Sequence, residues 1–475
     1  MLPTLTRRSL MAAAGAVGAG AVLARPLAAA AAPDAAPVNP LVRQRADAQV
    51  FRHSDGFYYL TGSVPEYDRL VLRRSRTLAG LTTAPERVLW RHLASGPLSG
   101  FIWAPELHLV DGRWVMYFAA GPSGGGEDVF RIRTWAVTCD GPDPMTGTWS
   151  LLGQFQAPWD SFNLDSTSFV HRGTRYFCWA QREPGIETNS NLYLAPLATP
   201  LTLARKPVRL SVPTLDWEIR GYKVNEAPSF LARGGRVFIS YSASATDERY
   251  CLGLLSARAD ADLMAEASWT KSPVPVFTTS AATGVYGPGH NSFTVDEKGR
   301  DVLVYHGRDY RAIKGDPLFD PNRHTRVQRL YYTPDGMPDF GIPVGNGVLP
   351  DRLSPLDAAG AFLRHDGEAV SVGTGALPAS QFRQLAGPGG TVSLAPIELP
   401  DHRLCWAADG SVALVRADAA AERSRFRRVA GLADRRGVSF VAAGMAGAYL
   451  QHAGAKVMLS HGAGLNRTSA TFLLS

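Results

Sequence analysis

Short stretches of alternating apolar and polar residues fill the first two thirds of the chain, and one pattern returns five times. Each copy has a short apolar strand, a turn that contains glycine, and a longer strand rich in aromatic and β-branched residues. Alternation with a period of two residues and this turn chemistry predict a β-hairpin in every copy. The copies cover residues 48–63, 105–121, 166–181, 227–244 and 290–307.

The spacing of these hairpins predicts the fold of this part of the chain. Their second strands begin near Phe57, Trp114, Arg175, Val237 and Val302, so the period is about 60 residues. That spacing leaves room for two more strands in each copy. A four-stranded unit repeated five times is a five-bladed β-propeller. A β-sandwich with long loops is the alternative, and the regular repeat disfavours it.

The predicted propeller also indicates where functional side chains should meet. The first strand of each blade lines the central channel, so residues at the starts of these strands gather at one rim. Desolvation and mutual repulsion make clustered carboxylates costly there, and the packing of a repeat does not require them. We therefore interpret them as a functional cluster rather than as caps of strand ends. The residues at these positions are Asp47, Trp103 with Glu106, Asp165, Glu226 and His290.

Three carboxyl groups at one rim can hydrolyse a glycosidic bond. The reaction needs one protonated acid and one ionised carboxylate, and a third carboxylate raises the pKa of the acid by repulsion. In an inverting enzyme the acid and the base lie about 6.5–9.5 Å apart, and opposite walls of a channel suit this separation. Aromatic residues near the rim are candidates for stacking on sugar rings, with blade packing as the alternative: Phe101, Trp103, Trp159, Trp217 and Tyr222.

Residues from about Asn39 to Asn346 closely resemble glycoside hydrolase family 43, of the exo-acting arabinofuranosidase kind. The motifs that carry this likeness include RADAQVF, IWAPELH, PWDSFNLDSTSF, GYKVNEAPSF and YGPGHNSF. The resemblance implies that Asp47 is the general base, that Asp165 modulates the pKa of the acid and orients it, and that Glu226 is the general acid. It implies an inverting enzyme that releases arabinose from α-1,5-linked arabinan without a cofactor for the chemistry.

Two basic residues acquire expected roles from the same resemblance. His290 matches a histidine that faces an ion or water in the central channel, and this ion is often calcium. Calcium prefers oxygen ligands, so the alternative is a core histidine that holds a water. Arg326, in the segment DPNRHTRVQ, matches a cation near the acids and is expected to hold Asp47 ionised. The alternative for Arg326 is a salt bridge at the surface.

The pattern changes after about Pro350, where a shorter repeat of strand-like segments begins. Three units of about 40–46 residues follow one another and predict a β-trefoil. The chain is therefore expected to be all-β, with a propeller over residues 38–350 and a trefoil over residues 351–475. The positions that align between the units are Leu363, Leu404 and Leu450, together with Phe382, Phe426 and Phe472.

The three units resemble the arabinofuranose-binding family 42 carbohydrate-binding module. The resemblance implies sugar contacts at His365, Asp418 and His452. Trp406 stands in place of the histidine in the middle unit, and the third unit lacks an acid in the equivalent stretch. A trefoil with a purely structural role is therefore the alternative.

The first 32 residues resemble a twin-arginine export signal, with Arg7 and Arg8 before a weakly apolar stretch rich in alanine and glycine. No other segment is apolar and long enough to span a bilayer. We expect a secreted, extracellular monomer without membrane contact. Its expected partners are arabinan or arabinoxylan polysaccharides and the oligosaccharides derived from them.

Composition agrees with two globular domains, since the chain has 475 residues of which 45% are hydrophobic and 19% are charged. The net charge is +7, but the basic residues are scattered, which disfavours nucleic-acid binding. The four cysteines lack the spacing of metal sites. We expect buried free thiols, with one disulfide after export as the alternative.

Other functions use the same residues. A β-xylosidase, or an arabinofuranosidase that debranches arabinoxylan, would need the same three acids in a pocket of different shape. A non-catalytic carbohydrate-binding propeller belongs to another functional class and predicts that one acid is lost. Because Asp47, Asp165 and Glu226 are all present, the sequence favours the enzyme.

Overall fold

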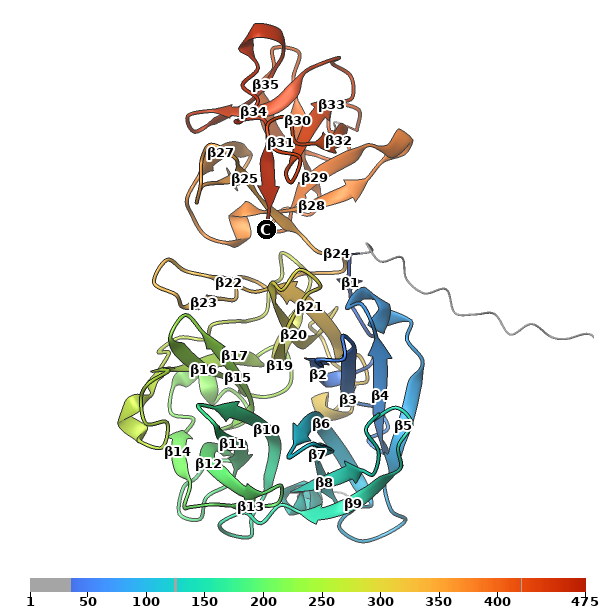
Figure 1. The fold of residues 1–475 in the computed structure, drawn as a ribbon, viewed down its shortest axis with the longest axis vertical. Helices are drawn as coiled ribbons and strands as arrows, with labels where there is room; N and C mark the ends of the chain where they lie inside the picture. Colours follow the sequence, from blue (N-terminus) through green and yellow to red (C-terminus); the bar gives the residue numbers. More distant parts are fainter. Residues whose placement is uncertain (1–35, 124–125, 420) are drawn as a thin grey trace, which may run out of the picture. The chain divides into compact units, whose positions relative to one another are not determined.

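The computed structural model describes residues 36–475 except 124–125 and 420, so the predicted export signal over residues 1–32 lies outside the described residues. The described chain is all-β, and five antiparallel sheets surround one centre in its first part (Figure 1). The predicted five-bladed propeller is thereby confirmed. Short 3-10 helices lie in the loops: η1 (Ala79–Thr82), η2 (Gly126–Arg131), η3 (Asp216–Glu218), η4 (Glu266–Ser268), η5 (Pro317–Phe319), η6 (Pro378–Ser380), η7 (Pro388–Gly390) and η8 (Gly462–Gly464).

The blades follow one another along the chain, and the strands of each blade pair in sequence order. The first blade contains β2 (Ala46–Arg52), β3 (Tyr58–Ser63), β4 (Arg69–Ser75) and β5 (Glu86–Arg91). The second contains β6 (Gly100–Val110), β7 (Arg113–Gly121), β8 (Arg133–Cys139) and β9 (Trp149–Gln154). The third contains β10 (Asn163–His171), β11 (Thr174–Gln181), β12 (Asn191–Thr199) and β14 (Val208–Ser211), with β13 (Thr202–Leu203) beside β12.

The fourth blade contains β15 (Asn225–Arg233), β16 (Arg236–Ala243), β17 (Cys251–Arg258) and β18 (Thr270–Lys271). The fifth contains β19 (Tyr286–Val295), β20 (Asp301–Arg308) and β21 (His324–Arg329), followed by the pair β22 (Tyr331–Tyr332) and β23 (Pro338–Asp339).

The N-terminal segment completes the fifth blade. β1 (Val38–Asn39) pairs with β24 (Gly347–Val348), and the side chain of Asn39 exchanges hydrogen bonds with the backbone of Val327 in β21. Leu41 continues this contact, because its N–H donates to the carbonyl of Thr325. The edge of the last blade is therefore paired with residues 38–42, which precede the first blade, and the ring of blades is closed.

Apolar side chains between neighbouring blades form the propeller core. Tyr117 and Phe155 of the second blade pack against Phe177 of the third, with ring centroids 4.9 and 4.6 Å from that of Phe177. Burial of each such side chain contributes about 1.5–3 kcal/mol. Packing of this kind holds the channel-lining strands in fixed positions.

The C-terminal part is a second all-β domain with three similar units, as predicted for a trefoil. The aligned leucine and phenylalanine positions form its core, and Leu363, Leu404 and Phe472 have no exposed surface. The first unit holds β25 (Asp351–Pro355), β26 (Phe362–Asp366), β27 (Ala369–Gly373) and β28 (Gln381–Ala386). The second holds β29 (Val392–Pro396), β30 (His402–Trp406), β31 (Val412–Arg416) and β32 (Phe426–Ala430), and the third holds β33 (Val438–Ala442), β34 (Tyr449–Ala453), β35 (Lys456–Ser460) and β36 (Phe472–Leu474).

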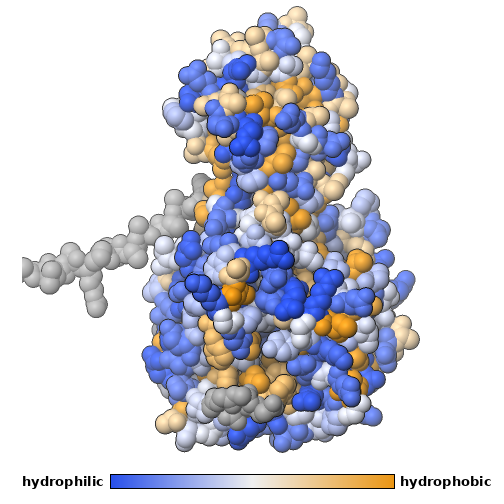
Figure 2. Space-filling view, turned by 180° about the vertical axis from the view of Figure 1, so that it is seen from behind, coloured by the Kyte–Doolittle hydropathy of each residue, from blue (hydrophilic) through white to orange (hydrophobic). Residues whose placement is uncertain are grey.

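The surface and the cysteines agree with the sequence. On the face shown in Figure 2, small apolar areas are separated by polar side chains, which is the ordinary surface of a globular protein. Within the described ranges, no helix is long and apolar enough to cross a membrane. Cys139, Cys178, Cys251 and Cys405 are buried and free, as predicted.

Candidate active site

The innermost strand of each blade is irregular near its start. There the pairing with the second strand shifts register, and a residue other than glycine has a positive φ angle. A left-handed residue in a β-bulge breaks the alternation of the strand and redirects side chains. The candidate functional side chains therefore occur at bulges. The left-handed residues are Asp47 (φ 53°), Ala104 (45°), Asp165 (49°), Ala227 (53°) and His290 (41°).

Side chains of neighbouring blades hold three of these bulges. In each case the N–H of the left-handed residue donates to a side chain on the second strand of the preceding blade. These acceptors occupy equivalent places, because each lies opposite the residue just before a bulge. The blades are thus joined around the channel by hydrogen bonds as well as by packing. The bonds run from Asp47 N to His306 Nδ1 (3.2 Å), from Ala104 N to Ser63 Oγ (2.8 Å) and from His290 N to Ser242 Oγ (2.8 Å).

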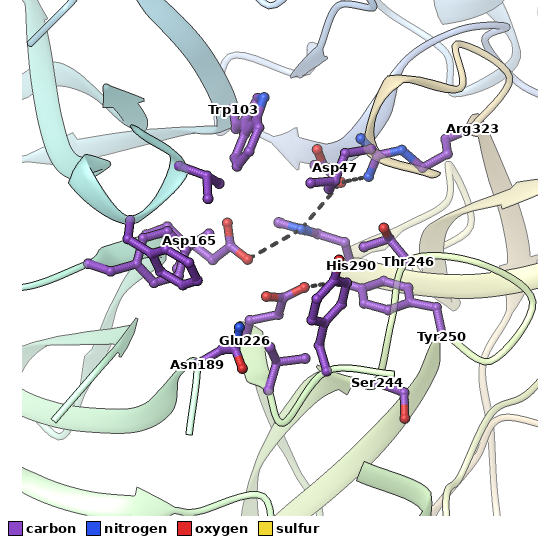
Figure 3. Close-up of a pocket in the computed structure, with 17 residues that line it drawn as sticks. Asp47, Trp103, Asp165, Asn189, Glu226, Ser244, Thr246, Tyr250, His290 and Arg323 are labelled. Atoms are coloured by element: carbon purple, nitrogen blue, oxygen red, sulfur yellow. Dashed lines mark hydrogen bonds and ion pairs between the residues drawn. The ribbon is translucent and has the colours of Figure 1, made fainter. Parts of the chain in front are cut away.

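One cavity of about 210 Å³ lies where the starts of β2, β6, β10, β15 and β19 meet. It is smaller than the pockets of about 300–1,000 Å³ that hold drug-sized ligands, so it suits one small unit of a longer molecule. Figure 3 shows carboxyl groups from three blades that point into this cavity. The structure therefore brings Asp47, Asp165 and Glu226 together, although they are far apart in the sequence.

The surroundings of Asp47 favour its ionised form. Burial alone would raise the pKa of Asp47, but Arg323, His290 and His306 outweigh it and hold this pKa well below its usual range. Arg323 Nη1 lies 3.2 Å from Oδ1 of Asp47, and the hydroxyl of Ser63 donates to Oδ2 at 2.6 Å. Asp47 is therefore a carboxylate at neutral pH.

His306 supports Asp47 from the fifth blade as a neutral imidazole. Burial lowers the pKa of His306 to about 3, so the ring carries no charge at neutral pH. Its Nδ1 lies 3.2 Å both from the backbone nitrogen of Asp47 and from Oδ1 of the same residue. The ring also stacks on Tyr250, with an interplanar angle of 2°.

Asp165 and Glu226 have the opposite electrostatic character. Burial, Glu226 and Asp47 raise the pKa of Asp165 well above its usual range. Burial raises the pKa of Glu226 to about 7, Asp47 adds to this effect, and the hydroxyl of Tyr250 opposes it. Because the two acids repel each other, they titrate as a pair and hold a proton between them near neutral pH. One pocket thus contains an ionised carboxylate and a protonated carboxyl group.

His290 lies between two of these acids. Its Nδ1 is 3.4 Å from Oδ1 of Asp47 and 3.8 Å from Oδ2 of Asp165, and burial lowers the pKa of His290. Calcium takes six to eight oxygen ligands. Among the described residues, no group of three or more His, Cys, Asp or Glu side chains is arranged to hold a metal ion. These side chains do not supply a calcium site by themselves, and we assign no chemical step to an ion.

The candidate aromatic residues divide into two groups. Trp103 and Tyr222 line the cavity, and Tyr222 is 51% exposed. The other three lie in the packing around it, as the alternative interpretation predicted. Phe101 packs edge-to-face on Trp103, Trp159 packs edge-to-face on Tyr193, and buried Trp217 stacks on Tyr241.

The prediction that Arg326 holds Asp47 ionised is wrong. Arg326 lies within β21, opposite Tyr305, and its buried guanidinium group pairs with Asp309. Arg323 takes the expected place, because it immediately precedes β21 and so lies at the rim. The rule that selected the acids applied only to the first strand of each blade, whereas β21 is the third strand of the fifth blade, so it did not identify Arg323.

Two further residues of the cavity were not predicted from the sequence. Tyr250 donates its hydroxyl to Oε1 of Glu226 at 2.8 Å, and Asn189 lies on the opposite side of Glu226 in Figure 3. Both lie in loops that precede outer strands, where the hairpin repeat carries no signal.

The C-terminal domain places the candidate sugar-binding residues differently from the prediction. His365 Nε2 lies 3.5 Å from Glu398, and His452 Nε2 lies 2.8 Å from Asp357. Asp418 was expected to supply an acid, but its side chain is 75% exposed and lies 3.8 Å from an arginine, Arg416. The acids that face the histidines thus precede the aligned strands rather than follow them.

The middle unit has no histidine at this place, and Trp406 occupies it. The indole ring lies so close to Gly444 that a Cβ atom there would come within 2.8 Å of it. Gly444 precedes Leu450 by as many residues as Glu398 precedes Leu404. An aromatic ring over a glycine therefore replaces the pairing of an imidazole with a carboxylate in this unit.

Family comparisons match both parts of the chain. The model of Glycosyl hydrolases family 43 matches residues 37–338, and that of the Alpha-L-arabinofuranosidase B (ABFB) domain matches residues 401–475. The second match covers most of the middle unit and all of the last unit of the C-terminal domain.

Several characterised proteins are similar over most of their length. An extracellular exo-alpha-(1->5)-L-arabinofuranosidase from Streptomyces avermitilis is 52% identical over 77% of this chain and 76% of its own length. Alpha-L-arabinofuranosidase 43 from Humicola insolens is 49% identical over 87% of this chain and 89% of its own. A crystal structure of an alpha-L-arabinofuranosidase from Lactobacillus brevis is 49% identical in sequence, with a TM-score of 0.64. The match covers 65% of this chain and 98% of that protein.

Proposed function

This chain belongs to glycosyl hydrolases family 43, and from this membership and its similar relatives we infer that it is an extracellular exo-acting α-L-arabinofuranosidase. It releases arabinose from α-1,5-linked arabinan and arabino-oligosaccharides in this proposal. Two relatives, 52% and 55% identical to it, are named extracellular exo-alpha-(1->5)-L-arabinofuranosidases. The observation that carries the chemistry is one small pocket in which an ionised carboxylate faces a protonated carboxyl group.

We propose that Asp47 is the general base. Its pKa is held low, so the group accepts a proton from a water molecule at neutral pH. Ser63 and Arg323 orient the carboxylate by bonds to its two oxygens, which leaves its direction fixed. The activated water then attacks the anomeric carbon of the sugar in the pocket.

Glu226 is the general acid in this proposal. Its raised pKa keeps it protonated near neutral pH, so it can give a proton to the oxygen of the leaving sugar. Asp165 is the proposed modulator, because repulsion by Glu226 raises the pKa of Asp165 and keeps a proton within this pair of acids. The base comes from the first blade and the acid from the fourth, on different walls of the pocket, and we propose inversion of the anomeric configuration.

Trp103 and Tyr222 are the proposed sugar contacts. Trp103 lines the pocket, so its ring is placed to pack against the sugar. Tyr222 is half-exposed and also lines an adjoining groove, where the next sugar of the chain would lie. A pocket for one terminal unit that continues into a groove is the shape exo action requires.

The C-terminal domain is proposed to bind arabinofuranose side chains in its first and last units, at His365 and His452. Each of these histidines faces an acid, which gives a donor and an acceptor for sugar hydroxyls. Binding would raise the local concentration of polysaccharide near the pocket.

Three further expectations from the sequence remain predictions. They are the domain limits of 38–350 and 351–475, the export signal, and a structural calcium ion beside His290.

A substrate panel tests the function. The enzyme should cleave 4-nitrophenyl α-L-arabinofuranoside and linear arabinan and release only arabinose from the polymer, with little action on 4-nitrophenyl β-D-xylopyranoside. Chromatographic sizing of the products separates exo from endo action, and oligosaccharides as first products contradict the proposal. Proton NMR of the first product should show the inverted anomer.

A further inference from the structure

A further buried carboxylate lies close to the start of β15, outside the cavity. Glu218, in η3, has no exposed surface. A carboxylate removed from water is costly unless donors surround it. Five donors do so here: the N–H groups of Thr214 and Leu215 (both 2.9 Å), Nδ2 of Asn225 (3.0 Å), the hydroxyl of Tyr241 (2.9 Å) and Nζ of Lys271 (2.6 Å).

One of these donors belongs to the residue directly before Glu226. Asn225 is also fully buried, and each of its polar groups is bonded. Its Nδ2 donates to Glu218, and its Oδ1 accepts the hydroxyl of Ser211 at 2.6 Å. Its backbone N–H donates to the carbonyl of Ser190, and its carbonyl accepts the hydroxyl of the same serine, both at 3.1 Å.

These bonds fix the chain just before the bulge. Ser190 and Ser211 belong to the third blade, whereas Tyr241 and Lys271 belong to the fourth. Asn225 is therefore held between two blades at the place where β15 begins. The backbone of the residue that follows, Glu226, cannot shift along the strand without breaking this set of bonds.

A buried ion pair such as Glu218–Lys271 is weak evidence for stability, because desolvation offsets much of the attraction. Fixing a geometry is the better-supported use of such a pair. We propose that Glu218 and Asn225 are positioning residues for the general acid, which hold Glu226 at the leaving oxygen of the substrate. This inference rests on the proposed role of Glu226.

A displaced general acid has a recognisable kinetic signature. A sugar is a poor leaving group and needs the proton, whereas 4-nitrophenolate leaves readily without one. Loss of acid geometry therefore lowers kcat on α-1,5-arabinobiose far more than kcat on 4-nitrophenyl α-L-arabinofuranoside. A defect confined to stability lowers both by the same factor.

Asn225→Ala and Glu218→Gln are the test variants. General acid catalysis is worth about 10²–10⁴-fold, so a misplaced acid should cost about 10–100-fold in kcat on arabinobiose. The loss on the nitrophenyl substrate should be several times smaller. Equal losses on both substrates, or no loss on either, would overturn the proposal.

Asn39→Ala is the matched control. Asn39 is also buried and holds two strands by side-chain bonds to the backbone, but it lies at the edge of the fifth blade. Its replacement should lower the Tm without changing the ratio of the two kcat values. If Asn225→Ala fails to fold, Ser211→Ala is the alternative variant, because it removes only one bond to Asn225. It should change the ratio of the two kcat values in the same direction, by a smaller factor.

Glu226→Gln separates this inference from the proposed function. If Glu226→Gln shows no dependence on the leaving group, the assigned acid is wrong and the positioning inference falls with it. If Glu226→Gln shows the dependence while Asn225→Ala and Glu218→Gln do not, the acid stands and only the positioning inference is wrong.

Discussion

The hydroxyl group of Tyr250 donates a hydrogen bond of 2.8 Å to Oε1 of Glu226. Burial raises the pKa of Glu226, this bond lowers it, and the result is about 7. Tyr250→Phe removes the hydroxyl and keeps the ring that stacks on His306. The pKa of Glu226 should then rise. Because the acid acts in its protonated form, the basic limb of the kcat pH profile should move to higher pH.

Measurement of kcat on arabino-oligosaccharides between pH 4 and 10 checks this shift. Tyr117→Phe is the matched control, since Tyr117 is buried and donates to the carbonyl of Pro200, away from the pocket. A basic limb that stays in place or moves to lower pH in Tyr250→Phe would contradict the role given to this bond.

Arg323→Met should move the acidic limb of the kcat/KM profile. Arg323 helps to hold the pKa of Asp47 low, so its removal raises that pKa. The base acts in its ionised form. As the pH is lowered, the variant should therefore lose activity at a higher pH than the wild type does. Arg326→Met removes a nearby buried arginine that pairs with Asp309, so it should reduce stability and leave the limb unchanged. The opposite pattern would restore Arg326 as the partner of Asp47.

Asp47→Asn should reduce kcat about 10²–10⁴-fold on every substrate. The amide cannot accept the proton of the attacking water, and this step is needed whatever group leaves. The nitrophenyl glycoside should therefore lose as much activity as arabinobiose. Circular dichroism should show an intact fold, and retention of activity on the nitrophenyl substrate alone would remove Asp47 as the base.

Glu226→Gln should stabilise the fold at high pH. In the folded protein the pKa of Glu226 is about 7, whereas its ordinary value is 4.5. The folded state therefore holds the proton more tightly, and it loses stability as the pH rises from about 4.5 to 7. Glutamine removes this loss, so the gain in Tm over the wild type should be larger at pH 8 than at pH 5. Calorimetry at the two pH values measures it, and a larger gain at pH 5 would reverse the assignment.

Much of the fold follows from the repeat in the sequence. The hairpins at a period of about 60 residues predict the blades, because glycine turns and period-two alternation are local signals. The convergence of Asp47, Asp165 and Glu226 also follows, since the propeller topology alone brings the starts of inner strands together. The repeat in the sequence is therefore sufficient to locate these three side chains.

The surroundings could not be predicted in the same way. Arg323 and Arg326 occupy one short segment, and only the residue at which β21 begins decides which of them faces Asp47. Tyr250 reaches Glu226 from a loop that the repeat does not constrain. In the C-terminal domain, Asp357 and Glu398 face histidines of other units, so a search within each unit could not pair them. Contacts between distant segments were the part that local patterns missed.

The recurrent bulge has a consequence for how such a pocket can change over evolution. The same left-handed bulge occurs in the innermost strand of all five blades, and a side chain of a neighbouring blade holds three of these bulges. At two of these bulges the left-handed residue is alanine, Ala104 and Ala227, whose side chain is only a methyl group. Aspartate and asparagine tolerate the left-handed backbone, so either can replace alanine there at little conformational cost. Two of the five left-handed positions thus carry alanine, whereas the other three carry Asp47, Asp165 and His290.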